Sequence, residues 1–233
     1  TAFIDDFETT DSLNQMQAEF AIDGAPHWDF EMSKSKGQIR NFVSSDILIS
    51  GTKSISLDNN FNQKDNALLS SFNTLLGTFN LSNYQFDSTE LRLGLDYRLA
   101  GVPKFNNIGN RIWIRANDTA AWHLAYIFDT TNIGDVHHTG SISLNDFLAG
   151  DTSHFSTSVQ VKIEQYDTSL ICATDYGNGL TIDNFSIYKV ANDVQMLSID
   201  SLPKQSCGLG SRIPLTIQVR NGVMNPIENI KAF

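Results

Sequence analysis

The chain has 233 residues and a formal net charge of −10 at pH 7, with 16 Lys and Arg against 26 Asp and Glu. This balance gives no basic surface for nucleic acid or for anionic lipid. No run of 18 apolar residues occurs, so we expect no membrane span. Only 18 % of the residues are charged, and Asn, Ser, Thr and Asp take their place, which favours β-structure with many turns.

Short apolar runs recur about every ten residues and are separated by Gly-, Asn-, Asp- and Pro-rich segments, a spacing typical of a β-sandwich. The clearest run is 159–166, in which Val159, Val161 and Ile163 face one way while Gln160 and Lys162 face the other. We expect strands at 2–7, 27–32, 54–59, 67–72, 79–84, 89–99, 110–117, 122–129, 141–147, 159–166 and 180–190.

A second β pattern begins after this series. Residues 196–233 restart with a strand, a Pro- and Gly-containing turn, the run IPLTIQVRNG and a further turn. About 40 residues are too few to close a sandwich alone. We therefore expect residues 192–233 to be the start of a second β domain that continues beyond this chain.

Six segments stand in the order found in the MAM-type extracellular domain. They are DDFE at 5–8, HWDFE at 27–31, TKSISLDNNFNQKDNALLSSF at 52–72, ELRLGLDYRLAG at 90–101, NRIWIRANDTAAWHLAYIFD at 110–129 and LTIDNFSIYKV at 180–190. Residues 1–191 thus resemble that family. The resemblance implies an all-β, antiparallel jelly-roll sandwich in an extracellular or cell-surface protein.

Two features place the resemblance among bacterial proteins. The disulfide cysteines of the animal MAM domains are absent. The tail from Cys207 onward is similar to the CARDB-type Ig-like repeats of secreted Bacteroidota proteins. The resemblance therefore implies a jelly roll over 1–191 followed by a partial Ig-like domain over 192–233, within a large secreted or surface protein.

The sharpest candidate site joins the two ends of the jelly roll. The first and last strands of such a fold can be neighbours, which would bring Asp5, Asp6 and Glu8 near Asp183 and Asn184. Ca²⁺ takes about six to eight oxygen ligands, and it relieves the repulsion between adjacent carboxylates. The resemblance to this class of jelly roll also implies a metal at this place. We predict a Ca²⁺ site here; the alternative is that these residues cap turns or pair with Lys and Arg.

The three tryptophans are candidates for a ligand-stacking surface. Trp28 precedes DFE, where the family places a core aromatic, and Trp113 alternates with Ile112 and Ile114. We expect both Trp28 and Trp113 in or near the core, because large aromatic residues are mostly buried. Trp122 follows the turn NDTAA and is the candidate ligand contact.

Three other features have plain interpretations. The acidic segment 58–66 lacks the Gly and the final Glu of an EF-hand loop, which favours a hydrophilic turn. His137 and His138 are adjacent, so on a strand they point to opposite faces and favour an exposed pair over a zinc site. For the two cysteines we expect a buried thiol at Cys172 and a loop thiol at Cys207, rather than a disulfide between them.

The motifs of common catalytic sites are missing. The sequence has no G-x-S-x-G elbow, H-E-x-x-H motif, P-loop or GxGxxG. We predict a non-catalytic adhesion or ligand-binding module, stabilised by Ca²⁺, that meets a glycan or protein ligand and is joined to further domains of its own polypeptide. The alternative is a carbohydrate-binding accessory domain of a secreted hydrolase; an enzyme in its own right is a third reading.

Overall fold

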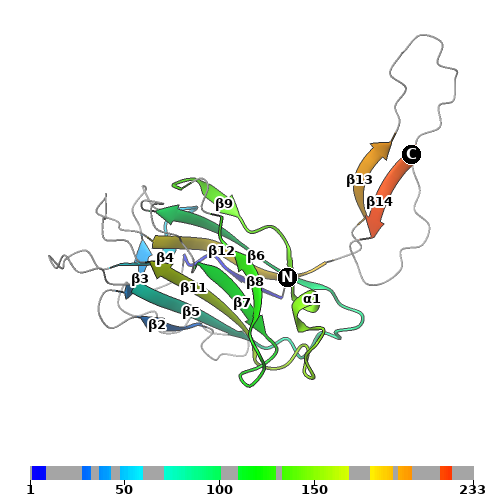
Figure 1. Cartoon of the computed structure of the whole chain (residues 1–233), viewed down its shortest axis with the longest axis horizontal. Coiled ribbons are helices and arrows are strands. Elements are labelled where there is room, and N and C mark those ends of the chain that lie inside the picture. Colours follow the sequence, from blue (N-terminus) through cyan, green and yellow to red (C-terminus); the bar gives the residue numbers. More distant parts are fainter. Residues whose placement is uncertain are drawn as a thin grey trace, which may run out of the picture.

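The computed structural model describes residues 2–8, 28–32, 37–42, 48–59, 71–100, 110–129, 133–167, 179–190, 194–200 and 216–221. Within these residues the first domain is a sandwich of two antiparallel sheets (Figure 1). The seven-stranded sheet contains β1 (Phe3–Asp5), β3 (Gly37–Phe42), β4 (Ser54–Asn59), β6 (Leu91–Ala100), β9 (Val136–His138), β10 (Ile142–Ser143) and β12 (Gly179–Lys189).

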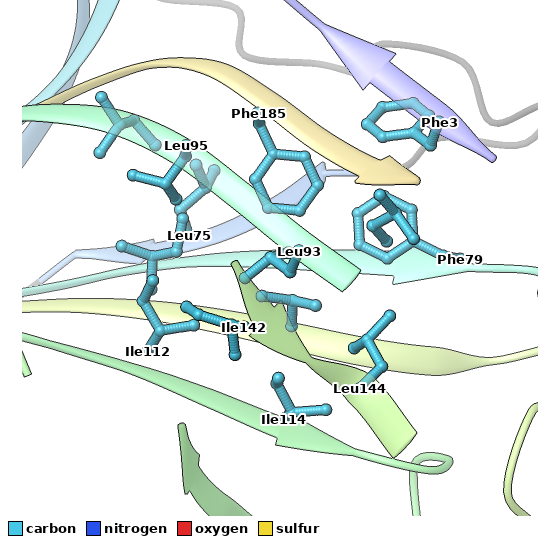
Figure 2. Close-up of a cluster of buried hydrophobic side chains, with 14 of the residues drawn as sticks. Phe3, Leu75, Phe79, Leu93, Leu95, Ile112, Ile114, Ile142, Leu144 and Phe185 are labelled. Atoms are coloured by element: carbon cyan, nitrogen blue, oxygen red, sulfur yellow. The ribbon is translucent and has the colours of Figure 1, made fainter. Parts of the chain in front are cut away.

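The second sheet has five strands in the order β2-β5-β11-β7-β8. Their bounds are β2 (Trp28–Met32), β5 (Ser71–Phe79), β7 (Arg111–Arg115), β8 (His123–Ile127) and β11 (Val159–Asp167). Apolar side chains from the two sheets meet between the layers, as Figure 2 shows for Leu75 and Ile112 on one side and Leu93 and Phe185 on the other. The predicted all-β jelly-roll sandwich is confirmed.

Period-two alternation decides which side chains enter this core. Val161 and Ile163 of β11 are fully buried, as predicted. In β7 the buried residues are Ile112 and Ile114, so Trp113 between them projects from the opposite face of the sheet. Trp113, expected in or near the core, is half-buried on the outer face, because it alternates with two buried isoleucines.

The first and last strands of the sandwich are neighbours. β1 pairs antiparallel with β12, with Phe3 opposite Ile187 and Asp5 opposite Phe185. The register of β12 against β6 shifts after Asp183, and Asn184 adopts a left-handed backbone with φ of 50°. Asparagine tolerates this conformation better than most residues, and the resulting bulge locally redirects the side chains of β12.

An aromatic cluster fills the core where β1 and β12 meet β2 and β5. We call Phe3, Phe7, Trp28, Phe79 and Phe185 the aromatic corner. The Trp28 ring centroid lies 5.0 Å from that of Phe185 and 5.8 Å from that of Phe79, both edge-on. Trp28 is 3 % exposed, which confirms its predicted core position.

Close packing in the corner also fixes a glycine. A Cβ built on Gly77 would lie 2.6 Å from the Phe79 ring and 2.8 Å from that of Trp28. No side-chain carbon fits at that distance without moving the rings. Gly77 of β5 therefore lets the indole of Trp28 lie against the sheet.

Several elements differ from the sequence expectation. Of the strand predicted at 79–84, only Phe79 lies in a strand, as the last residue of β5. The chain turns from Asn80 on, where Asn80 Oδ1 accepts hydrogen bonds from Ser82 N and Oγ. The strand predicted at 141–147 is reduced to β10. The helix α1 (Leu144–Leu148) follows it, with the Ser143 hydroxyl capping Asp146 N at 3.3 Å. Strands β3 and β9 were not expected.

Two further strands follow the sandwich along the chain, in the region predicted to begin a second domain. β13 (Val194–Asp200) and β14 (Thr216–Asn221) pair antiparallel in a sheet of their own, outside the two layers of the sandwich in Figure 1. Both lie in the segments where strands were expected. The Ig-like assignment and the boundary at 191/192 stay predictions, and Cys172 and Cys207 lie outside the described residues.

No helix in the described part of the chain is long and apolar enough to cross a membrane.

Candidate functional site

The five residues of the predicted calcium site divide into two groups. Asp5 is 7 % exposed, and its two oxygens accept hydrogen bonds from Phe7 N and Trp28 Nε1, both at 2.8 Å. Asp6 is exposed and accepts from Glu8 N at 3.2 Å. Asp5 therefore fixes the aromatic corner, and Asp6 caps its own turn.

Glu8 binds the segment that leads into β4. Its Oε1 accepts from Thr52 N at 2.7 Å and from Lys53 N at 3.1 Å, and its Oε2 accepts from the Thr52 hydroxyl. These hydrogen bonds, led by that of the Thr52 side chain, lower the pKa of Glu8. Gly51 has φ of 58°, and a Cβ there would lie 2.0 Å from Glu8 Oε1, so this approach requires glycine.

Asp183 binds the same segment from the other side. Its Oδ2 accepts from Ser50 N, Ser50 Oγ and Ser54 Oγ at 3.1, 3.0 and 2.9 Å, and its Oδ1 accepts from Asn184 N at 2.7 Å. Asp183 is fully buried. Burial raises its pKa and outweighs the hydrogen bonds, which lower it. Asn184 Nδ2 donates to Ser50 Oγ and to Asp96 Oδ2.

The structure thus brings Glu8, Asp183 and Asn184 to one segment, residues 50–54. The carboxylates of Asp5 and Asp6 instead accept hydrogen bonds within the aromatic corner and the turn that follows β1. The carboxylates of Glu8 and Asp183 accept from N–H and O–H donors of this segment. Among the described residues, no three His, Cys, Asp or Glu side chains are grouped to hold a metal ion. Calcium binding here stays a prediction.

The two adjacent histidines face different neighbours. His138 Nδ1 lies 2.7 Å from Asp96 Oδ1, whereas the His137 ring stacks on Tyr97 with centroids 5.2 Å apart. This is the divergence expected of neighbouring residues on a strand. The acidic segment 58–66 lies outside the described residues apart from the backbone of the last two residues of β4.

A different group of side chains covers the outer face of the five-stranded sheet. Cations and indole rings alternate there along β7, β11 and the residue before β8. We call this set the cation–aromatic ladder, and its members in spatial order are Arg111, Trp113, Lys162, Trp122 and Arg115.

The distances within the ladder are those of cation–π contacts. Lys162 Nζ lies 5.3 Å from the centroid of Trp113 and 4.6 Å from that of Trp122. The guanidinium carbons lie 5.8 Å (Arg111 to Trp113) and 4.3 Å (Arg115 to Trp122) from their rings. All five side chains are half-buried, so each is partly open to solvent while its conformation is restrained.

Hydrogen-bonding groups accompany the ladder on the same face. Trp113 Nε1 donates to Glu164 Oε2 at 2.6 Å, and Glu164 Oε1 lies 2.6 Å from Lys162 Nζ. Gln160 accepts from Arg115 Nε at 2.6 Å and donates to Thr78 Oγ1 at 3.1 Å. The face therefore combines indole rings, guanidinium groups, an amide and a carboxylate.

A turn positions Trp122 over this face. Asn117 Oδ1 accepts from Thr119 N at 2.9 Å, from Thr119 Oγ1 at 2.8 Å and from Ala120 N at 2.9 Å. The chain then reverses from β7 into β8 and delivers Trp122 beside Lys162. Trp122, the predicted ligand contact, thus lies on a partly exposed face together with Trp113.

Sequence reasoning missed four of the five ladder residues. The signal was present in the alternation R-I-W-I-R at 111–115 and V-Q-V-K-I at 159–163, where every second residue is a buried aliphatic. The residues between them must share the outer face if β7 and β11 are neighbours. That pairing, Lys162 opposite Trp113, is long-range and known only from the fold.

No protein-family model matches the sequence, and no curated protein matches it either. The MAM-type and CARDB-type resemblances therefore stay predictions.

Similar solved structures include two carbohydrate-binding modules. One is the family 11 module of Clostridium thermocellum in complex with a mixed-linked β-1,3-1,4 tetrasaccharide, with 11 % identity, 78 % of this chain and 91 % of that chain covered, and a TM-score of 0.41. The other is the CBM22-2 xylan-binding domain of Paenibacillus barcinonensis, with 15 % identity, 82 % and 100 % covered, and a TM-score of 0.41.

A third similar structure is the enzymatically active domain of tailspike protein 4 of bacteriophage CBA120. It shares 10 % identity over 70 % of this chain, with a TM-score of 0.40, and this chain spans 19 % of its length. A binding module and an enzyme thus match equally well, and likeness at this level assigns no function.

Proposed function

We propose that this chain is a non-catalytic module that binds a glycan on the outer face of its five-stranded sheet, within an extracellular or cell-surface protein. The observation that carries the proposal is the cation–aromatic ladder: Trp113 and Trp122, both half-buried, share one sheet face with polar side chains. We propose a glycan, rather than a protein, as the ligand of this face.

The chemistry of the face suits a sugar. A pyranose ring has C–H groups on its faces, which pack on an indole, and hydroxyls around its rim, which need donors and acceptors. Trp113 and Trp122 supply the rings, and the half-buried Glu164 and Arg115 supply the polar groups; the buried Gln160 holds Arg115 in place. A few polar groups placed among aromatic side chains are typical of small-molecule sites.

The strands also hold these groups rigidly. Lys162 is opposite Trp113 in the β11–β7 register, and Gln160 is opposite Arg115. Side chains fixed by packing and by hydrogen bonds lose little conformational entropy when a ligand arrives. Rigid placement on a sheet thus supports binding without rearrangement.

The test is binding to a panel of immobilised polysaccharides: xylan, galactan, mannan and mixed-linked β-glucan. Trp113→Ala and Trp122→Ala are compared with the wild type and with Ile4→Ala, which removes an exposed apolar side chain from β1 of the other sheet. We expect binding by the wild type and Ile4→Ala, and loss in both Trp variants. Retained binding in both Trp variants would refute the proposal for this face.

Stabilisation by Ca²⁺ is a separate part of the proposal. Glu8 and Asp183, which both bind residues 50–54, are its candidate ligands. We expect the melting temperature to rise with CaCl₂ and to fall with a chelator, and Asp183→Asn to remove the difference. An unchanged melting temperature together with no calorimetric heat on adding CaCl₂ would remove the calcium from the account and leave the ladder untouched.

A further inference from the structure

We infer that the glycan bound by the cation–aromatic ladder is anionic and that Arg111 and Arg115 recognise its carboxylate or sulfate groups. This inference rests on the proposed function and names the class of ligand for the same face. Its starting point is that neither of these two guanidinium groups forms an ion pair with a carboxylate among the described residues, although Glu164 is opposite Arg111 in the register.

The contrast with other cations of the sandwich is direct. Arg92, on the seven-stranded sheet, lies 2.5 Å from Glu90, and Lys162 lies 2.6 Å from Glu164. In a chain with 26 acidic and 16 basic residues, carboxylates are plentiful partners for a guanidinium. Arg111 and Arg115 differ from these cations because neither forms an ion pair among the described residues.

Arg115 keeps most of its hydrogen-bonding capacity. Its Nε donates to Gln160 Oε1 at 2.6 Å, and its guanidinium lies 4.3 Å from the Trp122 ring. No described residue accepts from its two terminal NH₂ groups. A guanidinium held in this way presents a planar pair of donors, which suits the two oxygens of a carboxylate or sulfate.

Arg111 shows an unmet donor more directly. Its Nε is shielded from solvent and has no hydrogen-bond partner within the described part of the chain. The described contact of its guanidinium is with the Trp113 ring at 5.8 Å. Buried donors are normally paired; since Nε is closed to an incoming ligand, a ligand meets Arg111 through its terminal NH₂ groups, which are not shielded.

The positions of the charges match an extended ligand. Arg111 and Arg115 lie on the same face of β7, four residues apart, which at the rise of a strand separates their Cα atoms by roughly 13 Å. Trp113 lies between them, and Lys162 lies opposite it on β11. A polymer with repeated charges could thus meet both guanidinium groups while its rings pass over the indoles.

The acidic residues of this sheet do not cancel the effect. Glu164 is opposite Arg111 in the register, but its two oxygens are held by Lys162 and by the indole N–H of Trp113. The acidic residues of β2 lie at the opposite edge, separated from β11 by β5. The half of the face formed by β11 and β7 therefore carries three cations and one carboxylate, in a chain with net charge −10.

The experiment compares polymers that differ only in charge. Polygalacturonate is tested against its fully methyl-esterified form, and dextran sulfate against dextran, by calorimetry with the whole chain. The variants are Arg111→Gln and Arg115→Gln, and the control is Arg92→Gln on the other sheet. We expect one charged polymer to bind at least about tenfold more tightly than its uncharged counterpart, with about a tenfold loss in each ladder variant and none in the control.

The outcomes separate the two proposals. Binding by polygalacturonate identifies a carboxylate ligand, and binding by dextran sulfate alone identifies a sulfate ligand; both support the inference. Equal affinity for charged and uncharged polymers, or charged-polymer binding unchanged in Arg111→Gln and Arg115→Gln, overturns it while glycan binding stands. Absence of binding to every charged and uncharged polysaccharide overturns both the inference and the proposed function.

Discussion

The aromatic corner and the cation–aromatic ladder each contain a tryptophan whose indole N–H donates to a carboxylate. In the corner, Trp28 Nε1 lies 2.8 Å from Asp5 Oδ2; in the ladder, Trp113 Nε1 lies 2.6 Å from Glu164 Oε2. The surroundings differ. Trp28 is 3 % exposed and packs on phenylalanine rings, whereas Trp113 is half-buried between cations.

The difference separates two uses of one residue type. Burial of Trp28 removes a large apolar area from water and stabilises the fold. Trp113 contributes less to the core, because Ile112 and Ile114 fill the inner face of β7 and Trp113 projects from the outer face. Part of its ring therefore stays accessible. The aromatic corner therefore stabilises the sandwich, whereas the proposed role of the cation–aromatic ladder is to bind a glycan.

The largest expected effect is that of Trp28→Ala. Removing a buried indole should lower the free energy of unfolding by about 3–5 kcal/mol, measured by urea denaturation. Trp113→Ala serves as the comparison and should cost about 1 kcal/mol or less, because its ring is half-exposed. Equal losses in the two variants would contradict the division between corner and ladder.

Next in size is Asp5→Asn. The Asp5 carboxylate accepts from two N–H donors, Phe7 N and Trp28 Nε1, but an asparagine can offer only one of them an oxygen. The other donor then faces an NH₂ group in a buried site, and the free energy of unfolding should fall by about 1–3 kcal/mol. A change below that range in urea denaturation would show that water or a rotation of the side chain repairs the contact.

Asn117→Ala should have an intermediate effect on stability and a clear one on binding. It removes the acceptor that holds Thr119 and Ala120 in the turn before Trp122. We expect a loss of about 1 kcal/mol in unfolding free energy and weaker glycan binding, because Trp122 is less fixed. Asp118→Ala in the same exposed turn is the control. Wild-type affinity in Asn117→Ala would mean that the turn does not position Trp122.

The smallest expected change is that of Glu164→Gln, the ladder counterpart of Asp5→Asn. The amide oxygen still accepts from Trp113 Nε1, while the ion pair with Lys162 is lost. A partly exposed pair of this kind contributes at most about 0.5–1 kcal/mol and is screened by salt. A loss as large as that of Asp5→Asn in the same urea series would remove the contrast between the two carboxylates.

Alternation and turn residues are local signals, and they predicted the sandwich. The neighbouring first and last strands and the burial of Trp28 were implied by the family resemblance. Trp113 was expected in or near the core, but alternation with two buried isoleucines places its half-buried ring on the outer face of β7. The sequence could not assemble the ladder, since Lys162 meets Trp113 only through the long-range pairing of β11 with β7. It brought Glu8 and Asp183 together but did not predict that residues 50–54 lie against both.

The most direct test of the central claim follows the three indole N–H signals by ¹H–¹⁵N NMR during titration with a short oligogalacturonate, and with a short xylo-oligosaccharide beside it. The account predicts that at least one of these ligands shifts the signals of Trp113 and Trp122 and leaves that of Trp28 unchanged. Binding of either sugar with the Trp113 and Trp122 signals unmoved, or no shift with both sugars, would contradict it.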